Sequence, residues 1–257
     1  MSSLRKAVLP EIMQEALYDE LYNTEEIYWW FRARRSIIHS LIRRYHKGPE
    51  PSILDIGCGA GYNLKYLSGH FSDVKGLDSS DRALSFCRER GVQALKGSLP
   101  DEVPFEAGSL DIVLMMDVLE HIEDDRGAVE AVWRLLKDSG LFIITVPAHR
   151  FLWTSHDELH SHKRRYETCE IRKLFEGLPF DKVLLSQFNT LLSPPIVASR
   201  LFAGKRRCRS EKAGINLLPG PINRLLESIF AAEKHVIPYI PLPFGISIIA
   251  VYRKKRL

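Results

Sequence analysis

The chain of 257 residues lacks several features that would define its class at once. Its four cysteines include no Cys-x-x-Cys pair and the sequence contains no His-Glu-x-x-His segment, so neither a disulfide framework nor a zinc motif is indicated. The 36 basic residues barely outnumber the 32 acidic ones, and this balance alone does not indicate a nucleic-acid-binding protein. We therefore expect a cytoplasmic protein without a metal.

Long uninterrupted hydrophobic runs are also scarce. Residues 235–252 contain no Asp, Glu, Lys or Arg, but three prolines and a glycine interrupt them. Because a membrane-spanning helix needs about 20 largely apolar residues, we interpret this stretch as a proline-rich loop leading into a buried strand at 246–252. Residues 1–10 lack the apolar core of a signal peptide, so secretion is not expected.

The hydrophobic spacing predicts an alternation of helices and strands. Apolar residues at helical intervals predict one amphipathic helix over 24–45, and residues 52–146 then read as strand, helix, strand in the rhythm of a parallel sheet. After residue 147 we expect a loop to 166, a helix at 168–177 and a strand at 180–188. The strands expected before the loop are 52–56, 74–78, 92–96, 110–116 and 140–146, separated by helices at 61–68, 82–90 and 127–136.

A glycine-rich turn follows the first expected strand. Asp55 closes the strand, and Gly57, Gly59 and Gly61 then let the backbone turn tightly and approach a ligand. The spacing is G-x-G-x-G, whereas the dinucleotide-binding loop G-x-G-x-x-G would place its third glycine where Tyr62 stands. The second strand ends at Asp78, 21 residues after Gly57, where an acid can accept hydrogen bonds from ribose hydroxyls.

These segments, together with Met116-Asp117-Val118-Leu119-Glu120-His121 and the turn at 136–141, resemble class I S-adenosylmethionine-dependent methyltransferases over about residues 50–148. The chain is similar to a bacterial type 11/type 12-like branch whose acceptor is unassigned and which shares an aromatic stretch like residues 28–32. The resemblance implies an α/β, Rossmann-like fold with a seven-stranded, mostly parallel sheet and helices on both faces. It also implies an N-terminal helical cover (1–48) and a methyltransferase domain (49–257) with a helical insertion at about 190–243.

The cofactor implied by the resemblance is S-adenosyl-L-methionine. One departure lies after the third strand, where many relatives place an acid for the adenine amino group and this chain has Ser98 and Leu99. Tyr28 or Trp29 is expected to roof the cofactor, and Arg34 to contact its methionyl carboxylate. The expected cofactor contacts are Asp55, Gly57, Cys58, Gly59, Gly61, Asn63, Asp78, Ser79, Ser98, Leu99, Met116, Asp117, Trp30 and Arg34.

The acceptor site should lie beyond the carboxyl ends of the strands, where residues 149–166 supply four histidines. His156, with Asp157 nearby, is our first candidate for a general base, followed by His160 and His121; surface or core packing is the alternative for each. A metal bound by the histidines at 156, 160 and 162 is a weaker alternative. Arg164 and Arg165 suit an anionic acceptor or simply face solvent. The expected substrate contacts are Trp153, His162, Arg164, Arg165 and Tyr166.

We therefore expect a methyltransferase for a small-molecule or lipid-linked glycan acceptor, acting on oxygen with a histidine base. Basic clusters at 205–209 and 253–256 could bring it to an anionic membrane surface. Two alternatives remain open. One is RNA or other nucleic-acid methylation, weakened because the (D/N)-P-P-(Y/F/W) segment typical after the fourth strand is missing. The other is a non-catalytic module that binds S-adenosylmethionine.

Overall fold

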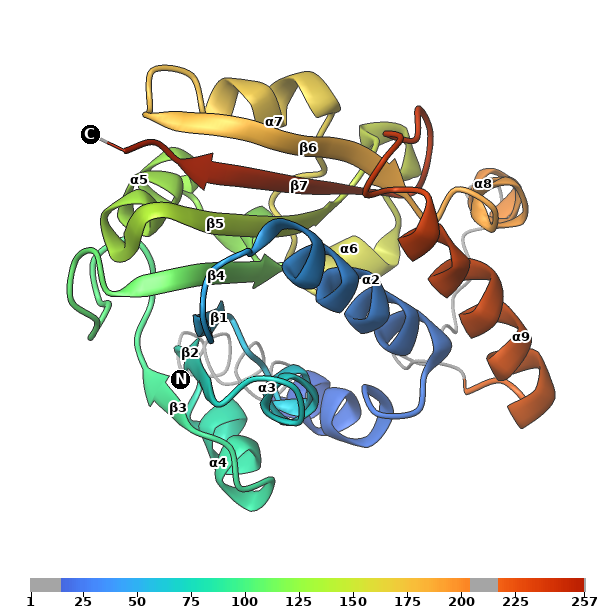
Figure 1. Cartoon of the computed structure of the whole chain (residues 1–257). Helices are drawn as coiled ribbons and strands as arrows, with labels where there is room; N and C mark the ends of the chain where they lie inside the picture. The colour runs from blue at the N-terminus through green and yellow to red at the C-terminus, as the bar shows by residue number, and fades with distance from the viewer. Residues whose placement is uncertain (1–14, 204–216, 257) are drawn as a thin grey trace, which may run out of the picture.

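The computed structural model describes residues 15–203 and 217–256, which form one sheet of seven strands with helices on both faces (Figure 1). The strand order is β3-β2-β1-β4-β5-β7-β6, and every pair is parallel except those that β7 makes with β5 and β6. The seven-stranded, mostly parallel α/β fold expected from the sequence is therefore confirmed.

The elements lie close to their expected positions. The strands are β1 (Ser52–Ile56), β2 (Asp73–Asp78), β3 (Ala94–Lys96), β4 (Leu110–Met116), β5 (Leu136–Pro147), β6 (Phe180–Phe188) and β7 (Ser247–Lys254). The helices are α2 (Trp29–Tyr45), α3 (Tyr62–Ser68), α4 (Asp81–Glu89), α5 (Asp125–Leu135), α6 (Ser155–Leu159), α7 (Thr168–Leu174), α8 (Ser193–Ala203) and α9 (Gly220–Ala231), with short 3-10 turns η1 (Leu119–His121), η2 (Arg150–Leu152) and η3 (Ala232–His235). Two differences stand out: β5 begins directly after α5, and α6 lies in a segment expected to be loop.

The sheet separates two hydrophobic clusters. Along β4, Ile112 and Leu114 belong to the cluster shared with α2, α3 and α9, while Val113 and Met115 belong to the cluster shared with α5 and α7. Because successive side chains of a strand point to opposite faces, a strand covered on both sides reads as a continuous apolar run. Helix α2 contributes to the first cluster directly, so the N-terminal cover and the sheet share one core.

The single helix expected at 24–45 is wrong at its beginning. Residues 15–24 are helical, a turn follows at 25–27, and α2 starts at Trp29. Asn223 of α9 explains the break, because its side-chain oxygen accepts the Trp29 backbone N–H at 3.0 Å and its amide donates to the Ile27 carbonyl at 2.8 Å. A residue almost 200 positions away thus caps α2, which local periodicity could not reveal.

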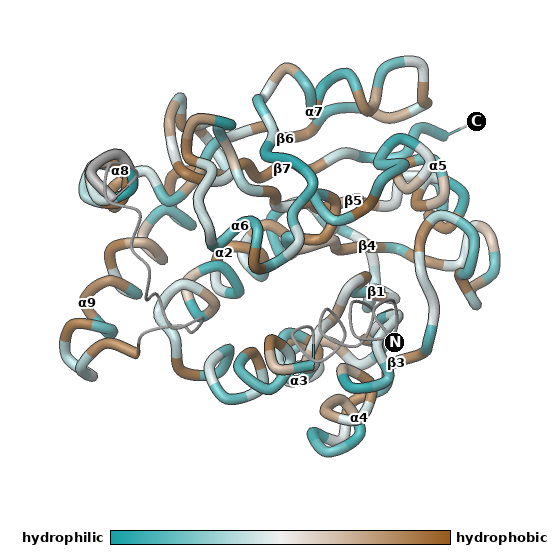
Figure 2. The backbone as a smooth tube through the Cα atoms, turned by 180° about the vertical axis from the view of Figure 1, so that it is seen from behind, coloured by the Kyte–Doolittle hydropathy of each residue, from teal (hydrophilic) through white to brown (hydrophobic). Residues whose placement is uncertain are grey.

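The insertion before β7 consists of α8, α9 and η3. Helix α9 packs beside α2 at the periphery and is largely hydrophobic (Figure 2).

The basic residues 205–209 and the N-terminal residues 1–10 lie outside the described residues. In the other basic cluster, Arg253 donates to the carbonyls of Ser139 and Tyr45, and buried Lys254 donates to those of Trp133 and Leu136. These two cations are therefore bound by backbone carbonyls and do not face a membrane, whereas Lys255 and Arg256 are exposed and their contact with a membrane stays a prediction.

Replacing Asn223 with Ala should destabilise the fold by about 1–2 kcal/mol, because the first turn of α2 loses its cap and the Ile27 carbonyl its donor. Urea unfolding measures the change. Arg224→Ala, at the exposed neighbouring position, is the matched control and should have little effect. Equal stabilities of the two variants would contradict this account of where α2 begins.

Candidate active site

The glycine loop joins β1 to α3 with a backbone that favours glycine. Gly57, Gly59 and Gly61 have φ angles of 67°, 56° and 85°. A Cβ on Gly57 would lie 2.4 Å from a methyl group of Val118, and one on Gly59 would lie 2.8 Å from Leu21. The loop thus needs glycine both for its conformation and for close approach by neighbouring segments.

Asp78 ends β2 beside this loop, as the sequence predicts. Its Oδ2 accepts the Gly59 N–H at 2.9 Å, and its Oδ1 accepts the Ser80 N–H at 3.0 Å and lies 3.4 Å from the Tyr18 hydroxyl. Burial raises the pKa of Asp78, while these donors oppose the shift. The carboxylate is therefore fixed at the end of its strand with a hydroxyl group already near it.

Residues 15–24 cover the loop and were missed by the sequence analysis. Tyr18 reaches Asp78, Leu21 lies against Gly59, and the Tyr22 ring stacks on Phe86 of α4 at 4.2 Å. The signal was present, because leucines at 17 and 21 and tyrosines at 18 and 22 repeat at a helical spacing of four. This segment therefore covers the glycine loop and the end of β2.

A protein carboxylate occupies the N-terminus of α3. Glu25 is buried, accepts the Tyr62 backbone N–H at 3.1 Å and forms an ion pair with Arg90. In dinucleotide-binding loops the pyrophosphate lies at this helix end. Because Glu25 already provides the negative charge, the site disfavours a pyrophosphate and agrees with the G-x-G-x-G spacing.

Several buried polar atoms beside the loop have no hydrogen-bond partner among the described residues. Two are acceptor groups: both carboxylate oxygens of Asp55 and the side-chain oxygen of Asn63. Two are donors, Nε of Arg34 and one terminal nitrogen of Arg35. Arg35 and Asn63 line the same small cavity as Met116. Such groups are costly to bury alone, and together they complement an ammonium and a carboxylate, the two charged ends of a methionyl group.

Arg34 also links the cover to the end of β4. Its guanidinium forms an ion pair with Asp117 and lies 4.5 Å from the centre of the Trp30 ring, while Asp117 accepts from the Thr145 hydroxyl at 3.3 Å. Trp29 instead is buried against Phe230 of α9, with ring centres 6.0 Å apart. The expectation that Trp29 roofs the cofactor is therefore wrong.

The remaining expected cofactor residues are less constrained. Cys58 is buried, with its sulfur 4.0 Å from that of Cys87, while Ser79 is exposed. Ser98 and Leu99 are partly buried after β3, where Ser98 pairs with Glu102 through its backbone. Their contact with the adenine stays a prediction.

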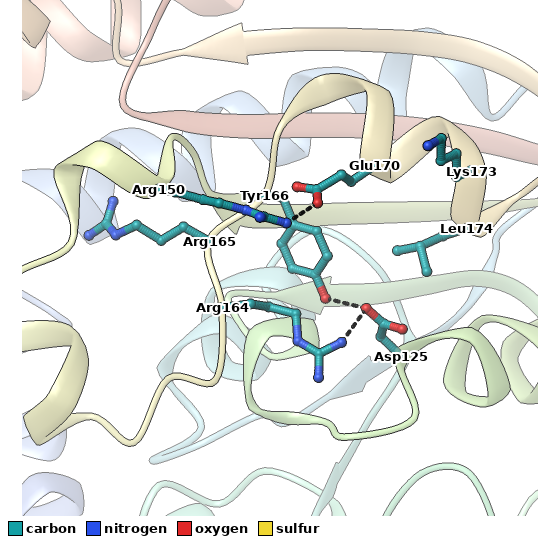
Figure 3. A pocket seen from close by; sticks show the side chains of 8 residues that line it. All are labelled: Asp125, Arg150, Arg164, Arg165, Tyr166, Glu170, Lys173 and Leu174. Atoms are coloured by element: carbon teal, nitrogen blue, oxygen red, sulfur yellow. Dashed lines mark hydrogen bonds and ion pairs between the residues drawn. The ribbon is translucent and has the colours of Figure 1, made fainter.

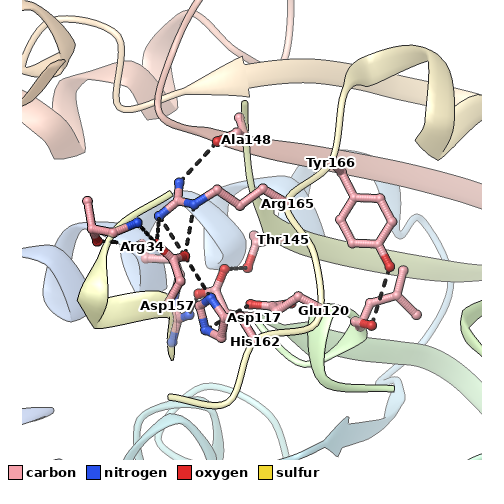
Figure 4. Close-up of polar contacts among 11 residues, drawn as sticks. Arg34, Asp117, Glu120, Thr145, Ala148, Asp157, His162, Arg165 and Tyr166 are labelled. Carbon is pink, nitrogen blue, oxygen red and sulfur yellow. Dashed lines mark hydrogen bonds and ion pairs between the residues drawn. The ribbon is translucent and has the colours of Figure 1, made fainter. Parts of the chain in front are cut away.

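The segment around α6, which follows β5 and is where we expect the acceptor to bind, is held together by hydrogen bonds to Asp157. Its buried carboxylate accepts from His162 Nδ1 at 2.9 Å, from Arg165 at 2.8 and 2.9 Å, and from the Thr154 backbone N–H at 2.8 Å (Figure 4). Although burial raises the pKa of Asp157, the bonds from His162 and Arg165 hold it well below its usual range. The expected pairing of His156 with Asp157 is therefore wrong, because His162 takes that position.

Three other histidines near this segment, His121, His156 and His160, have lowered pKa values. His156 and His160 stack with ring centres 4.2 Å apart. Partial burial, followed by the neighbouring imidazole, lowers the pKa of His156 to about 4 and also lowers that of His160. For His121, partial burial and the neighbouring His162 lower the pKa to about 4. At neutral pH these rings are unprotonated and able to accept a proton.

Of the three expected contacts at 164–166, Arg164 and Tyr166 share one partner and Arg165 has others. Arg164 and Tyr166 both bind Asp125, at 2.7 and 2.9 Å, and line a hollow of about 390 Å³ with Arg150, Glu170 and other residues (Figure 3). Arg165 is buried and engaged by Asp157 and the Ala148 carbonyl. The expectation that Arg165 binds an anionic acceptor is therefore wrong, whereas Trp153 is 38% exposed and accessible.

The comparisons with known proteins agree with this geometry. A family model described as a methyltransferase domain, of type 11, matches residues 54–144. A probable S-adenosylmethionine-dependent methyltransferase of Mycolicibacterium smegmatis is 29% identical over 157 residues, 60% of each chain. The ubiquinone biosynthesis O-methyltransferase of Bordetella avium is 34% identical over 94 residues, which are 34% of this chain and 39% of that protein. The solved S-adenosylmethionine-dependent methyltransferase of Thermotoga maritima, 16% identical, superposes with a TM-score of 0.56 over 93% of this chain and 96% of its own.

Together, the matched domain, the relatives and the fold support a class I S-adenosylmethionine-dependent methyltransferase. Residues 54–144 are the segment that matches the type 11 methyltransferase domain, and the cofactor named for the similar proteins is the one that the sequence predicts. The chain spans 60% of the length of the M. smegmatis relative and 39% of that from B. avium. The match to the family model, at residues 54–144, covers the glycine loop and the strands β1 to β4, and it does not include the insertion before β7.

The buried carboxyl group of Asp55 predicts a pH dependence of stability. Burial raises its pKa to about 7, so in the unfolded chain the group ionises first, and folding loses stability as the pH rises from about 4 to about 7. The loss should be on the order of 4 kcal/mol. Between pH 5 and pH 8, urea unfolding should show a fall in stability that is larger in the wild type than in Asp55→Asn by roughly 2.5–3 kcal/mol.

The control is Asp73→Asn, at the other, more exposed end of a neighbouring strand, which should follow the wild-type pH curve. Parallel curves for wild type and Asp55→Asn would contradict the assignment of Asp55 as the unneutralised buried acid.

Proposed function

We propose that the chain transfers the methyl group of S-adenosylmethionine to an oxygen atom of a small-molecule or lipid-linked acceptor, with His156 as general base. The observation that carries the proposal is the set of buried acceptors and donors beside the glycine loop, Asp55 and Asn63 against Arg34 and Arg35. These groups match the charged ends of a methionyl group, and Asp78 stands where ribose hydroxyls would bind.

In this proposal the chain mainly holds the reactants in line. When bound, S-adenosylmethionine supplies a methyl group already activated by a positively charged sulfur. Asp55 and Asn63 bind the ammonium group, Arg34 and Arg35 orient the carboxylate, and Asp78 fixes the ribose. Correct alignment of two reactants supplies a large part of the rate enhancement of such a reaction. His156, unprotonated at neutral pH, then removes the proton of the acceptor hydroxyl.

Oxygen is the favoured acceptor atom because a neutral imidazole suits deprotonation of a hydroxyl and because one similar protein is an O-methyltransferase. A nucleic-acid acceptor is the second reading, and a module that binds the cofactor without catalysis is the third. Tight RNA binding that weakens steeply with salt would favour the second. Cofactor binding without turnover of any hydroxyl acceptor would favour the third.

A lipid-linked acceptor is supported by exposed apolar side chains on and near α9. Leu225 is 60% exposed, Ile222 48% and Leu217 52%, and they lie on one helix and its entry. Exposed apolar groups that gather on one element mark an interaction surface. Within residues 15–203 and 217–256, no helix is long and apolar enough to cross a bilayer, so the proposed contact is with the membrane surface.

The first test is the cofactor itself. Isothermal titration should show binding of S-adenosylmethionine, with no comparable binding of NAD. Asp78→Asn should weaken the former by about 10- to 100-fold, because hydrogen bonds to a charged acceptor contribute about 1.5–3 kcal/mol. Asp73→Asn, on the same strand but at its opposite end, should bind like the wild type. NAD binding at the affinity of S-adenosylmethionine would refute the proposed function.

The second test concerns the membrane surface. The protein should sediment with anionic vesicles at low salt, and the double variant Ile222→Ser, Leu225→Ser should lose at least half of the bound fraction, because about 1.5–3 kcal/mol of apolar burial per side chain is removed. Thermal unfolding of the variant should be unchanged, since both side chains are exposed. Equal sedimentation of wild type and variant would exclude α9 as the contact.

A further inference from the structure

The carboxylate of Glu120 is buried at the centre of the acceptor side. The residue lies in η1, just after β4, and is fully buried, with 0% of its surface exposed. Neither carboxylate oxygen has a hydrogen-bond partner in the part of the chain that the structure describes. A buried carboxyl group without a hydrogen-bond partner is unfavourable, so the position suits a positively charged ligand.

Two imidazoles stand beside this carboxylate. Ligand atoms of Glu120, His121 and His162 all lie within 4.8 Å of one another, and Nε2 of His162 is 4.0 Å from Oε1 of Glu120. Bonds of about 2.0–2.2 Å to a tetrahedral metal ion would bring such atoms to about 3.4 Å of one another. If side-chain rotation shortened the distances between these ligand atoms by roughly 1 Å, two nitrogens and one oxygen could bind one metal ion.

The orientation of His162 is already that of a metal ligand. Its Nδ1 lies 2.9 Å from Oδ1 of Asp157, and because a carboxylate only accepts, Nδ1 carries the proton. Nε2 is then the atom with a free lone pair, and it faces Glu120 (Figure 4). Arg165 fixes Asp157 with two further bonds. Histidines that bind metals usually donate their other N–H to a carboxylate in this way.

Hydrogen bonds to backbone carbonyls hold together the two segments that supply the ligands. The backbone N–H of Lys163 donates to the Glu120 carbonyl at 2.9 Å, and the Tyr166 hydroxyl donates to the Leu119 carbonyl at 3.3 Å. The histidines at 156, 160 and 162, which the sequence suggested as an alternative metal set, do not form this cluster; His162 alone belongs to both. Glu120 is the ligand that the sequence analysis did not single out.

We propose that Glu120, His121 and His162 bind a divalent cation of the class that imidazole and carboxylate prefer, such as Zn²⁺ or Mn²⁺, and that an acceptor hydroxyl binds at its open position. The proposal rests on the proposed function and departs from the expectation of a metal-free protein. Three protein ligands with an exposed member, His121, leave room for a further ligand, as in catalytic rather than structural sites.

A cation at this site would select an acceptor that can bind it through a hydroxyl oxygen. Bound to the cation, a hydroxyl group becomes more acidic, and its proton passes to His156 or to water. The oxygen then forms the new bond to the methyl carbon as the carbon–sulfur bond breaks, and the neutral thioether leaves. A phenol or diol that can bind a cation fits this role better than an amine, which is already protonated at neutral pH.

Metal binding can be tested without knowing the acceptor. The full chain, stripped of metals with EDTA, is titrated calorimetrically with Zn²⁺ and with Mn²⁺, and we expect one equivalent of at least one of them to bind. Glu120→Gln and His121→Ala should each weaken that binding more than tenfold. His235→Ala, an exposed histidine on η3, is the matched control and should bind like the wild type.

Two further readouts separate folding from ligation. His121 is exposed, so its variant should fold normally, and both variants should bind S-adenosylmethionine with wild-type affinity. Substitution with Co²⁺ should give visible absorption bands that His121→Ala and Glu120→Gln lose and His235→Ala keeps. If neither Zn²⁺ nor Mn²⁺ binds, or if all variants bind the cation equally, the metal site is refuted. If the wild-type chain does not bind S-adenosylmethionine, the proposed function is refuted instead.

Discussion

Buried carboxyl groups without hydrogen-bond partners, at the carboxyl edge of the parallel sheet, are the constraint on which the rest of the site depends. Asp55 and Glu120 follow or end neighbouring strands, are fully or almost fully buried, and have no hydrogen-bond partner among the residues described. A fold tolerates such groups when a ligand supplies what the protein does not. Arg34 of α2 is a charge neighbour of both groups, and His162 lies 4.0 Å from Glu120.

The sequence predicts the cofactor half of the molecule well because its determinants are local. Continuous apolar runs define β1 and β4, and glycines at 57, 59 and 61 adopt the positive φ angles that their spacing suggests. Helix 15–24 was missed although its leucines and tyrosines repeat every four residues. The beginning of α2 could not be predicted, because it depends on Asn223, a partner in a distant insertion.

The acceptor half was predicted only as a set of residues. Adjacency in sequence suggested that Asp157 supports His156, yet in a helical turn neighbouring side chains diverge, and the carboxylate meets His162 five positions later. Arg165 then neutralises Asp157 instead of facing a substrate. Pairings of this kind follow from how the segment 154–166 folds back against η1, which no local pattern encodes.

The two halves meet at the end of β4. Asp117 binds Arg34 from the N-terminal cover, and three residues later Glu120 faces His162 from the segment after β5. One short segment therefore adjoins both the proposed methionyl position and the proposed acceptor position, which would put the transferred methyl group near Asp117. The insertion that carries α9 caps α2 through Asn223, packs Phe230 into the core and adds an exposed apolar surface.

The central claim is that the buried polar groups beside the glycine loop hold the methionyl end of the cofactor. A crystal structure of the full chain with S-adenosylhomocysteine tests it most directly. The account predicts the ammonium group within hydrogen-bond distance of Asp55 or Asn63, the carboxylate on Arg34 or Arg35, and the ribose on Asp78. A ligand bound elsewhere, with these side chains still lacking partners, would contradict it.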